Sequence, residues 1–360
     1  MTKFDRLVLT LISSFKGERT VSAVFHLLNG KRSGQTIQDV EYYKLKPYFS
    51  ILPKMKKELF DKMIDILVNN SWIELDDSTA IVTAKGREKI AVSENFHYNG
   101  WVYRGKEWVF FYRLSLIVQT LSHSITNDFS FIPVQKDEKI QQFARSFLKT
   151  HPYRNRNLIA SLKVELSQSL LKCEMADSKK NLIVHRLVGK DVSGWTWRQM
   201  ADEIECSEMD VYCSFIEALH IWLDVLFSHY QQFPLLYEIA RDCKISNPLT
   251  DSAAKTSRLF VQGYTMGQIA EMRKLKMSTI EDHFVEMAIN DPDFPIHQFL
   301  QDREFNEIQE FVQKSGTKKL RLLKENLPGL SYFQLRLGLA FGGGAADGQH
   351  PLRPEGEVRI

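Results

Sequence analysis

Cysteine is scarce in this 360-residue sequence, and the four cysteines that it has form no Cys-x-x-Cys pair. This spacing excludes the common zinc motifs and the thioredoxin-like redox motif. The sequence also lacks a signal-peptide pattern at its beginning. Together these features predict reduced thiols in a cytoplasmic protein. The four residues are Cys173, Cys206, Cys213 and Cys243.

The motifs of common catalytic folds are missing as well. The chain contains neither a G-x-x-x-x-G-K-[ST] phosphate loop nor a G-x-S-x-G nucleophile elbow. Glu281, Asp282 and His283 are adjacent, whereas metal ligands on one helix need a spacing of three or four residues. The sequence therefore predicts a non-enzymatic protein with no metal and no cofactor.

Long apolar runs and a large net charge are also absent. The best candidate for a membrane span, Trp108 to Leu121, is interrupted by Arg113 and is more typical of a buried helix. The net charge is only +3, so any contact with nucleic acid must depend on local basic patches. With 44% hydrophobic residues, the chain is expected to form globular domains without a membrane partner.

The clearest local pattern lies between Leu259 and Met287 and predicts a helix-turn-helix. Gly263 can adopt the left-handed conformation that ends a first helix. Thr265 is placed to cap the second helix, with a glutamine three residues on that completes a capping box. Ser278 is placed to cap the third in the same way, followed by a glutamate.

The first 93 residues predict a winged helix, in which helices are closed by a β-hairpin. Apolar residues recur at helical spacing in three segments, and two short strands flank an acidic turn. The helices are expected at 4–14, 20–28 and 54–68, the strands at 72–75 and 80–83, and the turn at Asp76-Asp77-Ser78.

A second helix-turn-helix is expected between His185 and Leu223, within a helical middle domain over 94–247. Thr196 and Ser207 are placed to cap its two helices. The later helix is expected to expose acidic residues, which would repel phosphate, so this unit is interpreted as structural. These residues are Glu208, Asp210 and Glu217.

Two middle segments each leave two interpretations open. The aromatic side chains between Phe96 and Ser130 suit either a core or a surface that stacks on exposed bases. The basic segment from Lys149 to Arg156, which includes Arg154, suits either a loop that contacts phosphates or a solvated surface.

Both ends of the chain resemble domains attached to RecQ-type DNA helicases. Residues 23–34, 42–75 and 81–86 resemble the winged-helix domain of those helicases. That domain has a Tyr-Phe-x-Ile segment before its long helix and a Leu-Thr-x-x-Gly segment at the end of its hairpin, and these places are held here by Tyr48-Phe49-Ser50-Ile51 and Val82-Thr83-Ala84-Lys85-Gly86. Residues 252–341 resemble the helix-turn-helix domain found in some of these helicases and in the bacterial YpbB family, and the order of parts also resembles that family. The residues that carry the second resemblance are Phe260, Gly263, Ile269, Ala270, Arg273, Ser278, Thr279, Ile280 and His283.

This resemblance implies a DNA-associated accessory protein that acts beside a RecQ-type DNA helicase in recombination or repair. A sequence-specific transcription factor and a pure protein-interaction scaffold are the alternatives. On the last helix only Thr279 and His283 suit base contacts, whereas Asp282 and Glu286 oppose close approach to DNA. We therefore expect contacts mainly to phosphates, on duplex or single-stranded DNA with weak sequence preference. The candidate residues are Arg273, Lys274, Lys276, Thr279, His283, Lys318, Lys319, Arg321, Arg154 and Arg156.

The predicted fold is mainly α and multi-domain. It has a winged helix at 1–93, a helical middle domain at 94–247, a helix-turn-helix domain at 252–341, and a disordered tail. The tail is expected from 342 to 360, where glycine, proline and polar residues replace the apolar pattern.

Overall fold

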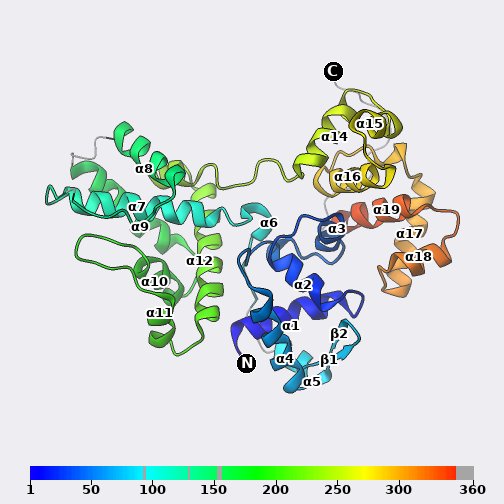
Figure 1. The fold of residues 1–360 in the computed structure, drawn as a ribbon, viewed down its shortest axis with the longest axis horizontal. Coiled ribbons are helices and arrows are strands. Elements are labelled where there is room, and N and C mark those ends of the chain that lie inside the picture. Colours follow the sequence, from blue (N-terminus) through cyan, green and yellow to red (C-terminus); the bar gives the residue numbers. More distant parts are fainter. Residues whose placement is uncertain (92–94, 129, 152–155, 346–360) are drawn as a thin grey trace. The chain divides into compact units, whose positions relative to one another are not determined.

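The structure, a computed structural model, describes residues 1–91, 95–128, 130–151 and 156–345 (Figure 1). It forms two compact units. Unit 1 contains residues 1–13, 27–30 and 47–246, and unit 2 contains residues 14–26, 31–46 and those from Asn247 onward. The predicted boundary near 247 lies at the entry into unit 2, whereas both sides of the predicted boundary at 93 lie in unit 1. The division into three domains stays a prediction.

Helices dominate both units, which confirms the mainly α fold class. Unit 1 holds α4 (Lys57–Asn69), α5 (Ala84–Ala91), α6 (Gly100–Tyr103), α7 (Glu107–Ser124), α8 (Glu138–Thr150), α9 (Arg156–Lys172), α10 (Asp177–His185), α11 (Trp197–Glu203), α12 (Glu208–Ser228) and α13 (Pro234–Ala240). Unit 2 holds α3 (Gly34–Tyr42), α14 (Asp251–Val261), α15 (Met266–Arg273), α16 (Met277–Asn290), α17 (Asp302–Ser315), α18 (Leu320–Asn326) and α19 (Tyr332–Ala345). The helices α1 (Lys3–Phe15) and α2 (Val21–Leu28) contribute residues to both units, as does the 3-10 turn η1 (Lys46–Tyr48), while a second turn, η2 (Ile296–Gln298), belongs to unit 2.

The β-hairpin is present where the sequence predicts it. Strands β1 (Ile73–Asp76) and β2 (Thr79–Val82) pair antiparallel, with Asp76 opposite Thr79. The two-residue turn therefore consists of Asp77 and Ser78, and Asp77 has the positive φ of 51° that short hairpins require. The hairpin is short, as expected for a small wing.

The aromatic segment of unit 1 forms core structure. Phe110 and Phe111 on α7 are buried, and the Phe110 ring meets the buried Trp222 ring of α12 edge-on at 5.1 Å. The prediction of a buried helix at 108–121 is confirmed. The 21-residue helix α12 is long and apolar enough to cross a membrane, which the sequence analysis did not predict. However, 61% of its most apolar 18-residue stretch is buried inside the protein, as expected for a core helix.

The acidic face predicted for α12 is wrong. Thr196 and Ser207 cap α11 and α12 as expected. Asp210, however, is buried and accepts a hydrogen bond of 2.8 Å from the backbone N–H of Phe4. Glu217 is also buried and pairs with Lys3 and Lys179. Both carboxylates therefore anchor other segments of unit 1, whereas Glu208 at the start of α12 and Asp224 near its end are exposed.

The first four residues of the predicted tail are helical. Residues 342–345 continue helix α19, which ends at Ala345, and residues 346–360 lie outside the described part of the chain. The four cysteines are free thiols, as predicted.

Candidate nucleic-acid interface

Local capping builds the first two helices of the helix-turn-helix as predicted. Gly263 has a φ of +90°, which ends α14. The Thr265 hydroxyl accepts from the backbone N–H of Gln268 at 3.3 Å, and the Gln268 side chain accepts from the N–H of Thr265 at 2.9 Å. This reciprocal capping box begins α15.

The predicted cap of the third helix is wrong. Helix α16 begins at Met277, two residues earlier than a cap at Ser278 would place it, and Lys276 occupies the N-cap position in extended backbone. The Lys276 side chain has no oxygen that could accept a hydrogen bond, and no side-chain cap is formed. Ser278 is exposed and lies within the first turn of the helix.

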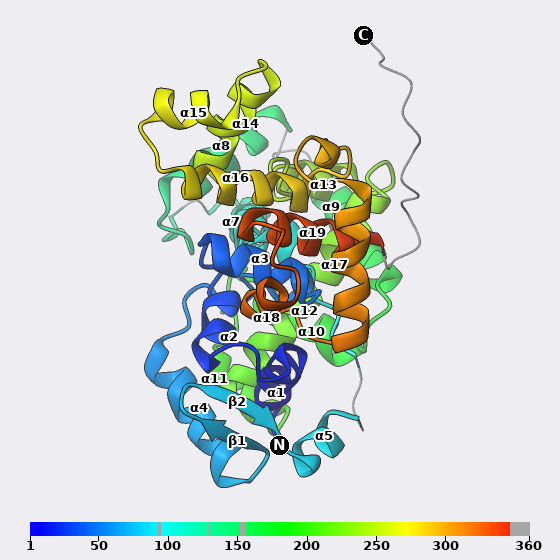
Figure 2. The ribbon, with the colours of Figure 1, turned by 90° about the vertical axis from the view of Figure 1, so that its right-hand side faces the viewer.

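Helix α16, which corresponds to the recognition helix of the motif, is the central helix of unit 2. It packs against α3, α14, α15 and α19, and Figure 2 shows α3 and α19 beside it. Ile280 and every residue from His283 to Ile289 are buried, whereas the first turn is exposed. A helix enclosed in this way presents only its beginning to a partner.

The acids expected to repel DNA have partners inside unit 2. Asp282 accepts a hydrogen bond from Gln38 of α3 at 3.4 Å and pairs with Arg336 of α19. The same guanidinium lies 2.8 Å from Glu281. Helix α3 approaches closely here, because a Cβ atom on Gly34 would lie 3.2 Å from the Asp282 carboxylate.

Glu286 is likewise internal. It is buried on α16 and accepts hydrogen bonds from the backbone N–H and, at 2.9 Å, the hydroxyl of Thr250, the residue that caps α14. Since these carboxylates connect α16 to α3, α14 and α19, they do not form the repulsive recognition surface that the sequence reading expected.

Two predicted DNA contacts are structural instead. His283 is buried, and its Nδ1 atom lies 2.9 Å from the hydroxyl of Thr256 on α14. Burial, reinforced by the nearby Arg273, lowers the pKa of His283 despite the opposing charge of Asp282. The Arg273 guanidinium donates to the carbonyl of Ser252 at 2.8 Å and also to Thr256. These bonds occupy Arg273 within the α14–α16 packing.

The turn before α16 leaves three candidates accessible. Lys274 and Lys276 are exposed, and Thr279 is half-buried. Lys274 has a φ of 52°, which reverses the chain between α15 and α16. Both lysines lie just before the exposed first turn of α16, where the helix dipole favours anions.

Of the three candidates near α18, one makes internal contacts and two are accessible. Lys318 is half-buried, and it donates its backbone N–H to Glu18 at 3.0 Å and its ammonium to the carbonyl of Tyr42. Burial lowers the pKa of Lys318, and this residue serves unit 2 internally. Lys319 is exposed, while the Arg321 side chain is 87% exposed and pairs with Glu325 across one helical turn.

The remaining two candidates cannot be placed. Arg154 lies outside the described residues, and Arg156 begins α9 with a side chain that is not described. The interpretation of this segment as a phosphate-contacting loop stays a prediction.

Metal ligands and reactive thiols were the remaining candidate chemical groups. The described residues contain no cluster of three or more His, Cys, Asp or Glu side chains placed to hold a metal. Burial raises the pKa of Cys173, Cys213 and Cys243 to about 12, which keeps these thiols protonated and poorly nucleophilic at neutral pH.

Comparison with known proteins supports the assignment of the C-terminal unit. Residues 252–339 match the family model described as a helix-turn-helix domain. The whole chain is similar to Protein YpbB of Bacillus subtilis (strain 168), with 34% identity over 350 residues that cover 93% of this chain and 96% of the relative. No solved structure matches the chain. At this identity and coverage, the chain belongs to the YpbB family and carries a C-terminal helix-turn-helix domain.

Proposed function

We propose that this protein is a non-enzymatic, DNA-associated accessory protein that contacts backbone phosphates with little sequence preference. The observation that supports this proposal best is the burial of α16. Base readout needs a recognition helix whose side chains enter the major groove. Here the face of α16 beyond its first turn is occupied by α3, α14, α15 and α19, which argues against the transcription-factor alternative.

The accessible cations suit phosphate contacts. Lys274 and Lys276 flank the start of α16, and Lys319 and Arg321 lie at the start of α18. Exposed lysine ammonium groups bind phosphates as point charges and carry no base specificity. Affinity should therefore depend strongly on salt and weakly on sequence.

A salt titration of duplex binding tests this proposal. The double variant Lys274→Gln and Lys276→Gln should weaken binding to random duplex DNA and reduce the salt slope by about 1.8, because each phosphate contact contributes about 0.9. The matched control replaces Lys163 and Lys172, two exposed lysines of α9, with glutamine and should leave the slope unchanged. An unchanged slope in the first variant would favour the scaffold alternative, since α16 would then be a packing helix only. Selection of one high-affinity palindromic site from random DNA would favour a transcription factor.

We further propose that the protein acts in the cytoplasm with a RecQ-type DNA helicase, in recombination or repair. Support comes from the resemblance of both ends of the chain to helicase-attached domains, combined with the missing phosphate loop. Accessory domains without a motor need one supplied by a partner. A calorimetric titration against the host's RecQ-type helicase after nuclease treatment should show binding, and no binding at tens of micromolar would contradict this partnership while leaving DNA binding intact.

A further inference from the structure

Unit 1 contains a cavity of about 730 Å³ that the helix-turn-helix does not involve. Its walls come from the segment between η1 and α4 and from the helices α7, α8, α11 and α12. This volume falls within the range of about 300–1,000 Å³ that small-molecule sites occupy. Two aromatic residues of the segment from Phe96 to Ser130, for which base stacking was one interpretation, line this cavity: Trp108 and Tyr112.

One wall of the cavity is made of four half-buried aromatic rings. Trp108 of α7 stacks on Tyr212 of α12 with ring centres 5.5 Å apart and 29° between the planes. Trp197 of α11 meets Tyr212 edge-on at 5.2 Å, and Tyr112 lies 5.5 Å from Trp108. All four residues are half-buried, and Trp108, Tyr112 and Trp197 also pack against the core of unit 1. Such surfaces stack on nucleobases irrespective of base identity.

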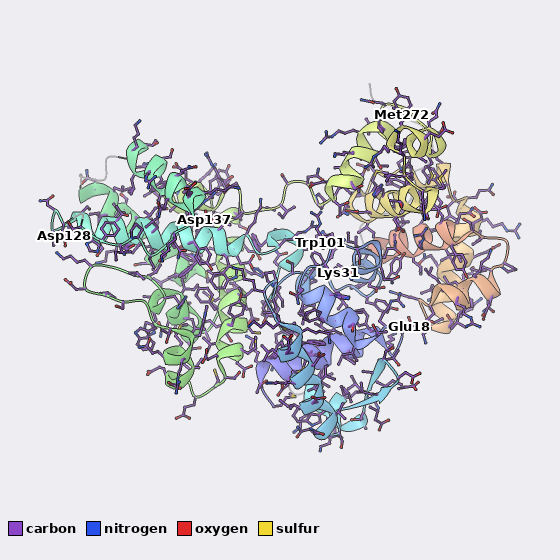
Figure 3. The ribbon with its side chains drawn as sticks, viewed as in Figure 1. Glu18, Lys31, Trp101, Asp128, Asp137 and Met272 are labelled. Carbon is purple, nitrogen blue, oxygen red and sulfur yellow. The ribbon has the colours of Figure 1, made fainter. Side chains whose placement is uncertain are left out.

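The charge around the aromatic wall is mainly positive. The Arg186 guanidinium lies 4.3 Å from the centre of the Trp197 ring, and its Nε atom is buried without a hydrogen-bond partner among the described residues. Lys54 and Lys56 are exposed at the rim. The one carboxylate of the lining is that of Asp137, which is labelled in Figure 3. It caps α8 by accepting from the N–H groups of Lys139 and Ile140 at 2.8 and 3.1 Å. An anionic ligand with a flat aromatic part would match both features.

We propose that this cavity binds an unpaired base of single-stranded DNA, with the base against the aromatic wall and the adjacent phosphates near Lys54 and Lys56. A peptide with an apolar side chain would also fit the rings, but it would leave the Arg186 guanidinium and both ammonium groups without anionic partners. A duplex keeps its bases stacked and paired, so it would not present one to the cavity. The site lies in unit 1 and does not depend on phosphate contacts by unit 2.

The test measures binding of the full-length protein to a fluorescent 12-nucleotide thymidine strand, to the same strand with abasic sites in place of the central bases, and to a random duplex. Trp197→Leu removes the aromatic face, and Trp197→Phe keeps a smaller one. We expect Trp197→Leu to weaken binding to the thymidine strand on the order of tenfold, with Trp197→Phe weakening it less. Thermal unfolding of each variant checks that unit 1 remains folded.

The abasic strand should bind the unaltered protein less tightly than the thymidine strand. Lys54→Gln with Lys56→Gln should reduce the salt slope on the thymidine strand by about 1.4, since single strands release about 0.7 counterion per contact. Equal affinity for both strands, or a folded Trp197→Leu variant with unchanged affinity, would overturn the base-binding site. Duplex binding that depends on Lys274 and Lys276 would survive either outcome, so the two proposals fail separately.

Discussion

The Nδ1 atom of His283 lies 2.9 Å from the hydroxyl of Thr256 inside unit 2. This contact joins α16 to α14, and Arg273 donates to the same hydroxyl from the end of α15. All three helices of the helix-turn-helix therefore meet at one buried hydroxyl. A residue chosen from the sequence as a base contact instead holds the motif together.

The environment of His283 makes the stability of unit 2 dependent on pH. Burial first, then Arg273, lowers the pKa of His283 in the folded protein, so the unfolded chain binds the proton more readily. Stability from neutral His283 is therefore present above the unfolded pKa of about 6.5 and is lost as the pH falls from there towards the folded pKa. Urea unfolding at pH 7.5 and pH 5.5 should show this loss. The variant His283→Gln should show a smaller difference between the two pH values, and an equal difference would assign the effect to other groups.

Alanine substitutions at Thr265 and at Ser278 should differ in their effect on the stability of the helix-turn-helix. Thr265→Ala removes a hydroxyl that accepts at the start of α15, and we expect it to lower the free energy of unfolding by about 1 kcal/mol. Ser278→Ala is the matched control, because Ser278 is exposed and does not cap α16; its effect should stay within about 0.5 kcal/mol. Chemical denaturation of both variants compares them directly. A larger loss for Ser278→Ala would mean that α16 begins at a later residue.

Alanine substitutions at two glycines with positive φ should distinguish the cost of backbone strain from the cost of steric overlap. Gly263 has a φ of +90° and open space around a Cβ atom, so Gly263→Ala should cost about 1–2 kcal/mol from the backbone alone. Gly30 has a φ of +71°, and a Cβ atom there would lie 2.3 Å from the Ser50 hydroxyl oxygen. Gly30→Ala should therefore cost about 2–5 kcal/mol. Equal losses in thermal unfolding would show that Ser50 moves aside without cost.

Glu107 in the core of unit 1 should reduce stability. Its side chain is fully buried, and neither oxygen has a hydrogen-bond partner among the described residues. Nδ1 of His220 accepts from the backbone N–H of Asn99, which places a proton on Nε2, 3.6 Å from the carboxylate. Because a buried carboxylate without hydrogen bonds is costly, Glu107→Gln should raise the free energy of unfolding by about 1–2 kcal/mol. A loss of similar size would show that the contact between the Glu107 carboxylate and Nε2 of His220 is net stabilising.

Features that depend on a few neighbouring residues could be predicted from the sequence. The caps at Thr196 and Thr265, the short hairpin and the buried helix α7 all follow from local hydrogen bonding or from apolar spacing within one element. The helix α3 was missed, because buried polar residues such as Gln38 and Asp39 interrupt its apolar pattern. Their partners are distant in sequence or lie on other elements, as in the pairing of Asp39 with Arg19.

The sequence by itself therefore determined the helical class, the hairpin and the presence of a helix-turn-helix. Only the tertiary structure decided which face of α16 is accessible. Judged from the sequence alone, Asp282 and Glu286 are typical of an exposed helix face. In the structure they pair instead with Arg336 and Thr250, respectively. The burial of a polar side chain depends on whether donors and acceptors from elsewhere reach it, because an unpaired buried charge is too costly to persist. Those partners lie 36 and 54 residues away along the chain, a separation at which local pattern carries no information.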